Sequence, residues 1–225
     1  MQYGVIAVVA LIVLQLTGIF QLIPTAGAAI PTPTDTTGVA VVTVSDPAAD
    51  MGKVRAVNMV MSRIEMQDSS GQWIMVMNTN RNYELLELNR TGQQAFAGAS
   101  ELQPGVYNRI RVRVENVMIT NDVGQQVNAQ LPSNEIIIDG PFTIQAKTMT
   151  ALNLDFSASN SLETDGSGQY QFRSQVQVRE RLNAQVQPGA STNGSFNVGV
   201  TGGQQGSDVT VKVDASGNAV KQGGN

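Results

Sequence analysis

The stretch VYNRIRVRV at residues 106–114 decides the fold class of this chain. Apolar and polar side chains alternate along it, and successive side chains of a β-strand point to opposite faces of a sheet. One predicted face carries the apolar residues Val106, Ile110, Val112 and Val114. The other predicted face carries Tyr107, Arg109, Arg111 and Arg113. The pattern predicts a strand with one buried face and one face in solvent.

The same period of two continues on both sides of this stretch. Further strands are predicted at residues 39–45, 54–66, 73–77, 83–88, 126–131, 135–138, 142–146, 149–156 and 170–179. Turn residues such as Asp139-Gly140-Pro141 separate them, no segment among them has a helical period, and only residues 91–103 are ambiguous. Short strands at this spacing predict an antiparallel β-sandwich over residues 38–187, immunoglobulin-like or transthyretin-like.

The predicted core follows from the same patterns. Residues 73–77 are apolar on both faces, which predicts a central strand that is covered on both sides. The residues expected in the core include Trp73, Ile110, Val112, Leu154 and Phe172.

Residues 188–225 differ from the rest because they are rich in Gly, Gln and Asn. Three short strands are predicted there, at residues 196–201, 209–213 and 219–222. This β appendage has too little apolar area to fold alone, so it must pair with its own domain or with a neighbour.

The N-terminal segment, residues 1–24, has a different character. Thirteen of the 21 residues from position 3 to position 23 are Val, Ile, Leu or Phe, and none is charged. As a helix this segment would be about 31 Å long, close to the thickness of the hydrocarbon layer of a bilayer. We therefore predict a long hydrophobic α-helix, followed at residues 25–37 by a linker rich in Pro and Thr.

One stripe of this predicted helix suits close packing against a second helix. Spacings of three and four residues join Gly4, Ala7, Leu11, Gln15, Gly18 and Leu22. Small residues on such a stripe allow helices to approach closely, and the Gln side chain can bond to a neighbour. The stripe predicts assembly of the chain with copies of itself.

No Lys or Arg occurs before Lys53, so a basic leader is expected to have been removed already. An apolar helix without a basic flank resembles the N-terminus of type IV pilins and archaeal flagellins. Bacterial type IV pilins usually have Glu at the fifth position, whereas this chain has Val5, so the archaeal kind is closer. Two alternatives stay open: a single membrane anchor, and a cleaved signal peptide with small residues at Ala26-Gly27-Ala28.

A second resemblance covers roughly residues 38–180. It rests on Ser45-Asp46-Pro47 after a Val-rich strand, the Trp73 strand, Leu85-Leu86-Glu87-Leu88, Pro104-Gly105-Val106-Tyr107 with Arg109 and Arg111, and Leu154-Asp155-Phe156. The segment resembles an uncharacterised domain family of surface lipoproteins. The resemblance implies an all-β surface domain and no particular activity.

Composition excludes several classes of function. The chain has neither Cys nor His, which removes Ser-His-Asp and Cys-His triads and the common zinc sites. Its net charge is −4 and only 14% of its residues are charged, which argues against nucleic acid as a partner. We expect a protein that is not an enzyme and that needs no cofactor or metal.

Three features are candidates for a role at the surface. The arginines at 109, 111 and 113 form a basic stripe, which suits either pairing with carboxylates of its own sheet or an interface with an acidic partner or anionic glycan. Two sequons, at Asn89 and Asn193, are possible glycosylation sites.

These observations leave two functional hypotheses. The first is a pilin-like structural subunit of an extracellular filament, inserted in the membrane before assembly and then packed through its N-terminal helix into a helical homopolymer. The second is a membrane-anchored module for binding or adhesion at the cell surface, with glycans as possible ligands.

Overall fold

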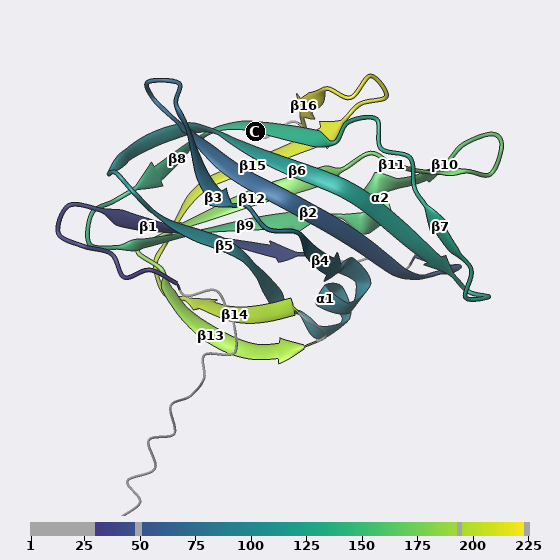
Figure 1. Cartoon of the computed structure of the whole chain (residues 1–225), viewed down its shortest axis with the longest axis horizontal. Coiled ribbons are helices and arrows are strands. Elements are labelled where there is room, and N and C mark those ends of the chain that lie inside the picture. The colour runs from purple at the N-terminus through teal and green to yellow at the C-terminus, as the bar shows by residue number, and fades with distance from the viewer. Residues whose placement is uncertain (1–29, 48–50, 193–194, 223–225) are drawn as a thin grey trace, which may run out of the picture.

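The computed structural model describes residues 30–47, 51–192 and 195–222, and these form a mainly β structure (Figure 1). The strands are β1 Gly38–Ser45, β2 Val54–Asp68, β3 Trp73–Met77, β4 Arg81–Glu84, β5 Gln94–Leu102, β6 Gly105–Asn121, β7 Gln126–Asn128, β8 Glu135–Ile144, β9 Met149–Phe156, β10 Leu162–Thr164, β11 Tyr170–Phe172, β12 Gln175–Leu182, β13 Gln185–Thr192, β14 Ser195–Thr201, β15 Gln204–Val213 and β16 Ala219–Lys221. The helices are α1 Leu85–Thr91 and α2 Ala158–Ser161.

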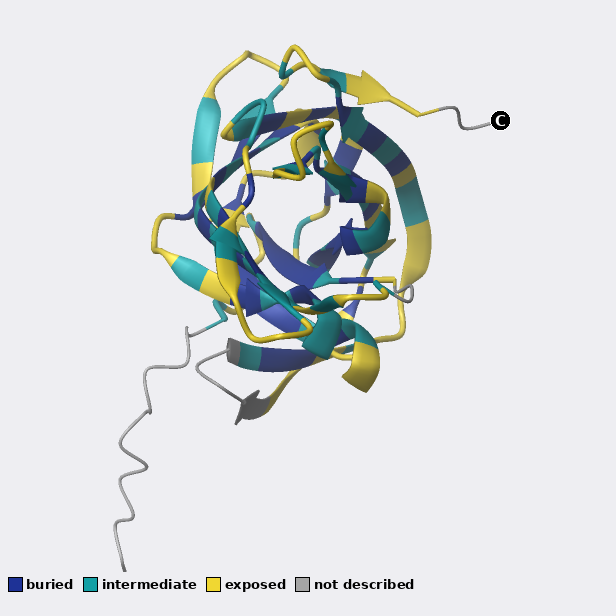
Figure 2. Cartoon of the chain, turned by 90° about the vertical axis from the view of Figure 1, so that its right-hand side faces the viewer, coloured by how far each residue is buried: buried dark blue, intermediate teal, exposed yellow. Residues whose placement is uncertain are grey.

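Two large sheets enclose one core. The eight-stranded sheet has the order β13-β14-β5-β1-β9-β12-β15-β16. The six-stranded sheet has the order β3-β2-β6-β7, with β4 also paired to β2 and β8 to β6. Seen from the end, the strands curl around a centre of buried residues (Figure 2). Strands β2 and β6 are 15 and 17 residues long, so the natural twist of a sheet accumulates along them and bends both layers.

The two sheets approach each other closely where β3 lies beside β5. A Cβ atom added to Gly98 of β5 would lie 2.7 Å from the carbonyl oxygen of Val76 in β3. Only glycine allows the two backbones to come this close. At the opposite side, β8 lies beside β15, where Ser207 donates a hydrogen bond to the carbonyl oxygen of Pro141.

The predicted core is confirmed for Ile110, Val112, Leu154 and Phe172, all of which are buried. Trp73 was assigned wrongly. Its strand, β3, is an edge strand of the six-stranded sheet, and the guanidinium carbon of Arg111 lies 4.2 Å from the centre of the Trp73 ring. The indole therefore packs on the outer face, because an apolar run on both sides of a strand also suits an edge where an Arg covers one face.

The predicted fold class is wrong in its arrangement of strands. The layers are strongly curled, and the sheet is not purely antiparallel because β1 and β9 pair in parallel, with Val42 opposite Leu152. Bulges contribute to the curling, since the pairing of β2 with β6 shifts register at four places. Alternation along single strands carries no information about which strands become neighbours, so the sequence pattern missed this topology.

The predicted fold class is also wrong in including a long N-terminal helix. The part of the chain that the structure describes contains no long apolar helix, since α1 has seven residues and α2 has four. Apolar composition predicts a dry environment for a segment, but it does not by itself establish a helix. The segment from residue 3 to residue 23, with the stripe of Gly4, Ala7, Leu11, Gln15, Gly18 and Leu22, lies outside the described residues. Within the described ranges, no helix has the length and apolar composition to cross a membrane.

Two local predictions are wrong, one about the faces of β6 and one about the end of β4. The pairing of β6 with β8 shifts register between Tyr107 and Arg109, and this bulge turns Tyr107 inward, where it is 2% exposed, and leaves Val106 44% exposed. The strand predicted at residues 83–88 ends at Glu84, because its carboxylate accepts hydrogen bonds from the backbone N–H groups of Leu86 and Glu87 and caps helix α1.

The C-terminal segment is part of the main sheet. The boundary predicted after residue 187 falls inside β13, and β15 pairs with β12 in the eight-stranded sheet. Val209, Val211 and Val213 of β15 are buried in the core. Of the two pairings expected for this segment, the structure contains the one within the same domain.

Candidate functional site

The outer face of the eight-stranded sheet is divided into an apolar part and a polar part. The β13–β14 hairpin folds over the apolar part, where Val39, Val41, Phe96 and Val198 form a second, smaller buried cluster. The Val side chains at 39 and 41 belong to β1, and two residues further along the same face the strand becomes polar, with Thr43 and then Ser45. The polar part is therefore set directly beside a covered apolar surface.

A row of hydrogen-bonded side chains begins on this polar part. The Thr43 hydroxyl donates to Oδ1 of Asn153 at 2.9 Å, and Nδ2 of Asn153 donates to the Ser45 hydroxyl at 2.9 Å. The Ser45 hydroxyl donates in turn to Oδ1 of Asp155 at 2.8 Å. The parallel pairing of β1 with β9 makes this possible, because it puts Thr43 opposite Asn153 and Ser45 opposite Asp155.

The row continues across β12 to β15. Arg179 donates from Nη1 to Oδ2 of Asp155 at 2.6 Å and from Nη2 to Oε1 of Gln177 at 2.6 Å. Nε2 of Gln177 then donates to Oδ1 of Asp208 at 2.7 Å. The side chain of Asp155 is only 2% exposed, whereas that of Arg179 is 47% exposed. The guanidinium of Arg179 thus covers the buried carboxylate of Asp155, while the rest of the Arg179 side chain remains accessible to solvent.

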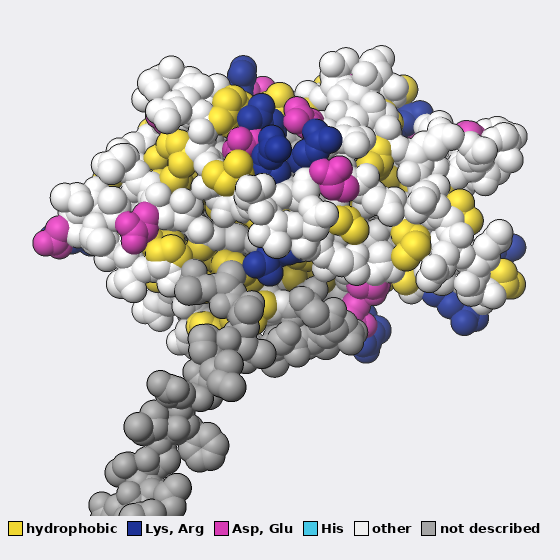
Figure 3. Space-filling view, viewed as in Figure 1, with side chains coloured by type: hydrophobic (Ala, Val, Ile, Leu, Met, Phe, Trp, Pro, Cys, Tyr) yellow, Lys and Arg dark blue, Asp and Glu magenta, His cyan; other side chains and the backbone are white. Residues whose placement is uncertain are grey.

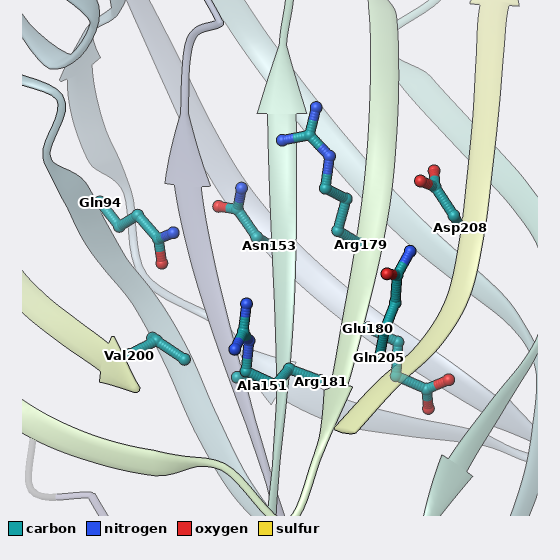
Figure 4. Close-up of a pocket in the computed structure, with 9 residues that line it drawn as sticks. All are labelled: Gln94, Ala151, Asn153, Arg179, Glu180, Arg181, Val200, Gln205 and Asp208. Atoms are coloured by element: carbon teal, nitrogen blue, oxygen red, sulfur yellow. The ribbon is translucent and has the colours of Figure 1, made fainter. Parts of the chain in front are cut away.

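Two hollows lie on either side of this row and together form what we call the polar groove. The larger hollow has a volume of about 390 Å³ (Figure 4). It is lined by Gln94, Ala151, Asn153, Arg179, Glu180, Arg181, Val200, Gln205 and Asp208. The smaller hollow has a volume of about 200 Å³. It is lined by Pro47, Asp155, Ser157, Asn160, Gln175, Gln177 and Thr210.

Glu180 fixes the end of the larger hollow where the two sheets meet. Its side chain accepts hydrogen bonds from the backbone N–H of Thr143 in β8 at 2.5 Å and from that of Ser207 in β15 at 2.7 Å. The residue is only 3% exposed. Figure 4 shows the Glu180 side chain turned away from those of Arg179 and Arg181. Its charge is therefore used to hold strands together.

The polar groove presents a surface of fixed hydrogen-bonding groups. Amide, carboxylate and guanidinium groups offer both donors and acceptors, and their mutual hydrogen bonds hold them in fixed orientations. Within the described ranges, no group of three or more His, Cys, Asp or Glu side chains is placed to hold a metal ion.

The predicted arginine stripe lies on the opposite side of the molecule, on the outer face of the six-stranded sheet (Figure 3). Each of its three arginines has a carboxylate partner: Arg109 has Asp139 at 2.5 Å, Arg111 has Glu65 at 2.7 Å, and Arg113 has Glu115 at 2.8 Å. Hydrogen bonds from the side chains of Ser62 and Arg113 hold the pKa of Glu115 below its usual value. The structure thus brings the three arginines together, with their charges paired inside the same sheet.

The two sequons are placed differently. Asn89 lies in α1, and its Nδ2 donates to the carbonyl oxygen of Asp46 at 3.2 Å, so a glycan on that nitrogen would disturb this contact. Asn193 lies outside the described residues.

Sequence patterns did not single out the polar groove. The residues of the larger hollow come from β5, β9, β12, β14 and β15, and those of the hydrogen-bonded row come from β1, β9, β12 and β15. These strands are neighbours in the eight-stranded sheet. In the sequence, each of these polar residues resembles an ordinary solvent-facing position of a strand. The one available signal was the alternation in β12, where Gln175, Gln177, Arg179 and Arg181 share a face.

Comparison with known proteins gives one family and no closer relative. No curated protein and no solved structure matches the chain significantly. One family model matches residues 37–174, which is well over half of the chain and ends directly before β12. Arg179, Arg181 and Asp208 of the polar groove therefore lie beyond the matched segment, whereas Thr43, Asn153 and Asp155 lie within it. The chain belongs to the family described as Domain of unknown function (DUF4382).

Proposed function

We propose that this chain is a binding module that holds an extended, hydroxyl-rich ligand, such as a polysaccharide, in the polar groove. The observation that carries the proposal is the continuous hydrogen-bonded row from Thr43 to Asp208. Within this row, the half-exposed side chain of Arg179 reaches solvent between the two hollows. Because their mutual hydrogen bonds already fix these side chains, they can bind ligand hydroxyl groups with little further loss of conformational entropy. The proposal keeps the cell-surface location that we expected from the sequence.

The shape of the polar groove supports a chain-like ligand. The two hollows follow one another along β9, with Ala151 and Asn153 lining the larger and Asp155 and Ser157 lining the smaller. Six residue steps along a strand correspond to about 20 Å. A ligand of several linked units fits this length better than a single small molecule does.

The first test is binding to a panel of neutral and acidic oligosaccharides, measured by isothermal titration calorimetry. We expect Arg179→Gln to weaken binding about tenfold, because it removes a charged donor in the middle of the polar groove while leaving a neutral amide in its place. Arg109→Gln is a matched control, since Arg109 is also paired with an Asp and is 49% exposed, but on the opposite face. Absence of binding across the panel, or equal loss in both variants, would overturn the proposal.

A further inference from the structure

We propose that the ligand of the polar groove is acidic and that Arg181, with Arg179 beside it, holds an anionic group of that ligand in the larger hollow. This inference rests on the function proposed above. It adds the charge of the ligand and the residue that recognises it.

The position of Arg181 makes its guanidinium part of the larger hollow. Arg181 follows Arg179 by two residues in β12, so both side chains leave the same face of the strand. The pairing of β12 with β15 shifts register between these residues, with Asp208 opposite Arg179 and Gln205 opposite Arg181. This bulge places one extra residue of β15 between the two cross-strand partners and bends the strand locally. Figure 4 shows the Arg181 side chain next to Ala151, between Val200 and β12.

Most donors of Arg181 are available to a ligand. Its Nη1 donates to the carbonyl oxygen of Gly202 at 2.9 Å, which fixes the side chain at one end. Within the described part of the chain, no carboxylate lies within 4.0 Å of its charged nitrogens. A guanidinium has five N–H donors in a planar fork that matches the oxygens of a carboxylate or a sulfate. Short side chains at Ala151 and Val200 leave room for such a group beside it.

The other charged side chains of the larger hollow already have hydrogen-bond or ion-pair partners within the protein. Glu180 is buried and bonded to the backbone of Thr143 and Ser207. Asp208 accepts from Gln177, a residue that lines the smaller hollow. Arg179 is paired with Asp155. Of the two arginines that line the larger hollow, Arg181 is therefore the one without a carboxylate partner among the described residues, and an anionic group of the ligand would supply that partner.

The test compares two forms of one sugar chain that differ only in charge. Wild-type protein is titrated with oligogalacturonate and with the fully methyl-esterified oligomer. We expect the acidic form to bind at least tenfold more tightly, which corresponds to about 1.4 kcal/mol, and this preference should fall as salt is added. Dextran sulfate against dextran forms the second arm and shows whether sulfate serves in place of carboxylate.

Variants then connect the preference to Arg181. Arg181→Gln should reduce the preference for the acidic form, measured as the ratio of the dissociation constants of ester and acid, to about threefold or less. Arg181→Lys keeps the charge and should retain part of the preference, while Arg109→Gln should retain all of it. Equal binding of the charged and neutral forms by wild-type protein, or an unchanged preference in folded Arg181→Gln, overturns the inference and leaves the binding function standing. Absence of binding to every oligosaccharide overturns the binding function itself.

Discussion

Replacing Glu180 by alanine tests whether one side chain joins the two sheets. The carboxylate accepts two backbone hydrogen bonds, at 2.5 Å from Thr143 of β8 and at 2.7 Å from Ser207 of β15. Leaving a buried donor without an acceptor costs about 1–3 kcal/mol, so losing both bonds costs about 2–6 kcal/mol. Removing a buried charge recovers part of its desolvation cost, and we therefore expect a net loss of about 2–4 kcal/mol. This is a large share of the 5–15 kcal/mol that stabilises a typical domain.

The assay is urea denaturation followed by far-ultraviolet circular dichroism, with the free energy of unfolding extrapolated to water. Glu180→Gln keeps one acceptor oxygen and should lose about half as much stability as Glu180→Ala. Glu87→Ala is the control, because Glu87 forms an exposed ion pair with Arg90 within α1, and such pairs contribute less than about 0.5 kcal/mol. A loss below about 0.5 kcal/mol in Glu180→Ala would refute the view that Glu180 closes the seam between β8 and β15.

Three further predictions concern stability. Val112→Asp should abolish cooperative thermal unfolding, because Val112 is fully buried and the change would place a charge without a partner in the core. Gly98→Ala should cost about 1–3 kcal/mol in chemical denaturation, because its Cβ would lie 2.7 Å from the carbonyl oxygen of Val76, and a midpoint equal to that of wild type would contradict the close contact of β3 with β5. The third concerns three aspartates in hairpin turns whose pKa values lie below the ordinary value: Asp68, Asp165 and Asp214. The main cause is a hydrogen bond from a nearby Ser hydroxyl for Asp68 and Asp165, and a hydrogen bond from a backbone N–H for Asp214. A lowered pKa in the folded state means that these turns stabilise the fold above the ordinary pKa of Asp and lose that contribution as the pH falls through the folded value. The triple Asp→Asn variant should therefore show a smaller drop in melting temperature between pH 7 and pH 3 than wild type does, and an identical drop would count against this role.

The sequence predicted those parts of the fold that depend on neighbours along the chain. The alternation around Ile110 and Val112 was enough to find β6 and its buried face, because the period of two is a property of any half-buried strand. It failed at Tyr107, where a bulge reverses the two faces and the pattern carries no mark of it. It failed again after Glu84, because this residue caps a helix of seven residues. A helix this short does not show a clear apolar period in the sequence.

The polar groove was beyond the reach of sequence patterns for a different reason. Thr43 and Asn153 are 110 positions apart in the chain, and only the parallel pairing of β1 with β9 puts them in contact. Periodicity indicates which face of a strand is polar, but it does not order the strands within a sheet. The arginine stripe was easier to find because Arg109, Arg111 and Arg113 lie on a single strand.

The central position of β1 has a mechanical consequence. This strand is paired along almost its whole length with β5 on one side and with β9 on the other. A tensile load that enters the domain at Gly38 and acts along the strand must therefore shear both hydrogen-bond ladders together. By contrast, β16 near the other end of the chain is an edge strand that pairs only with β15, through Ala219, Val220 and Lys221, and a pull there would separate those pairs one after another. The domain is thus built to withstand traction from its N-terminal side and to yield first at its C-terminal edge.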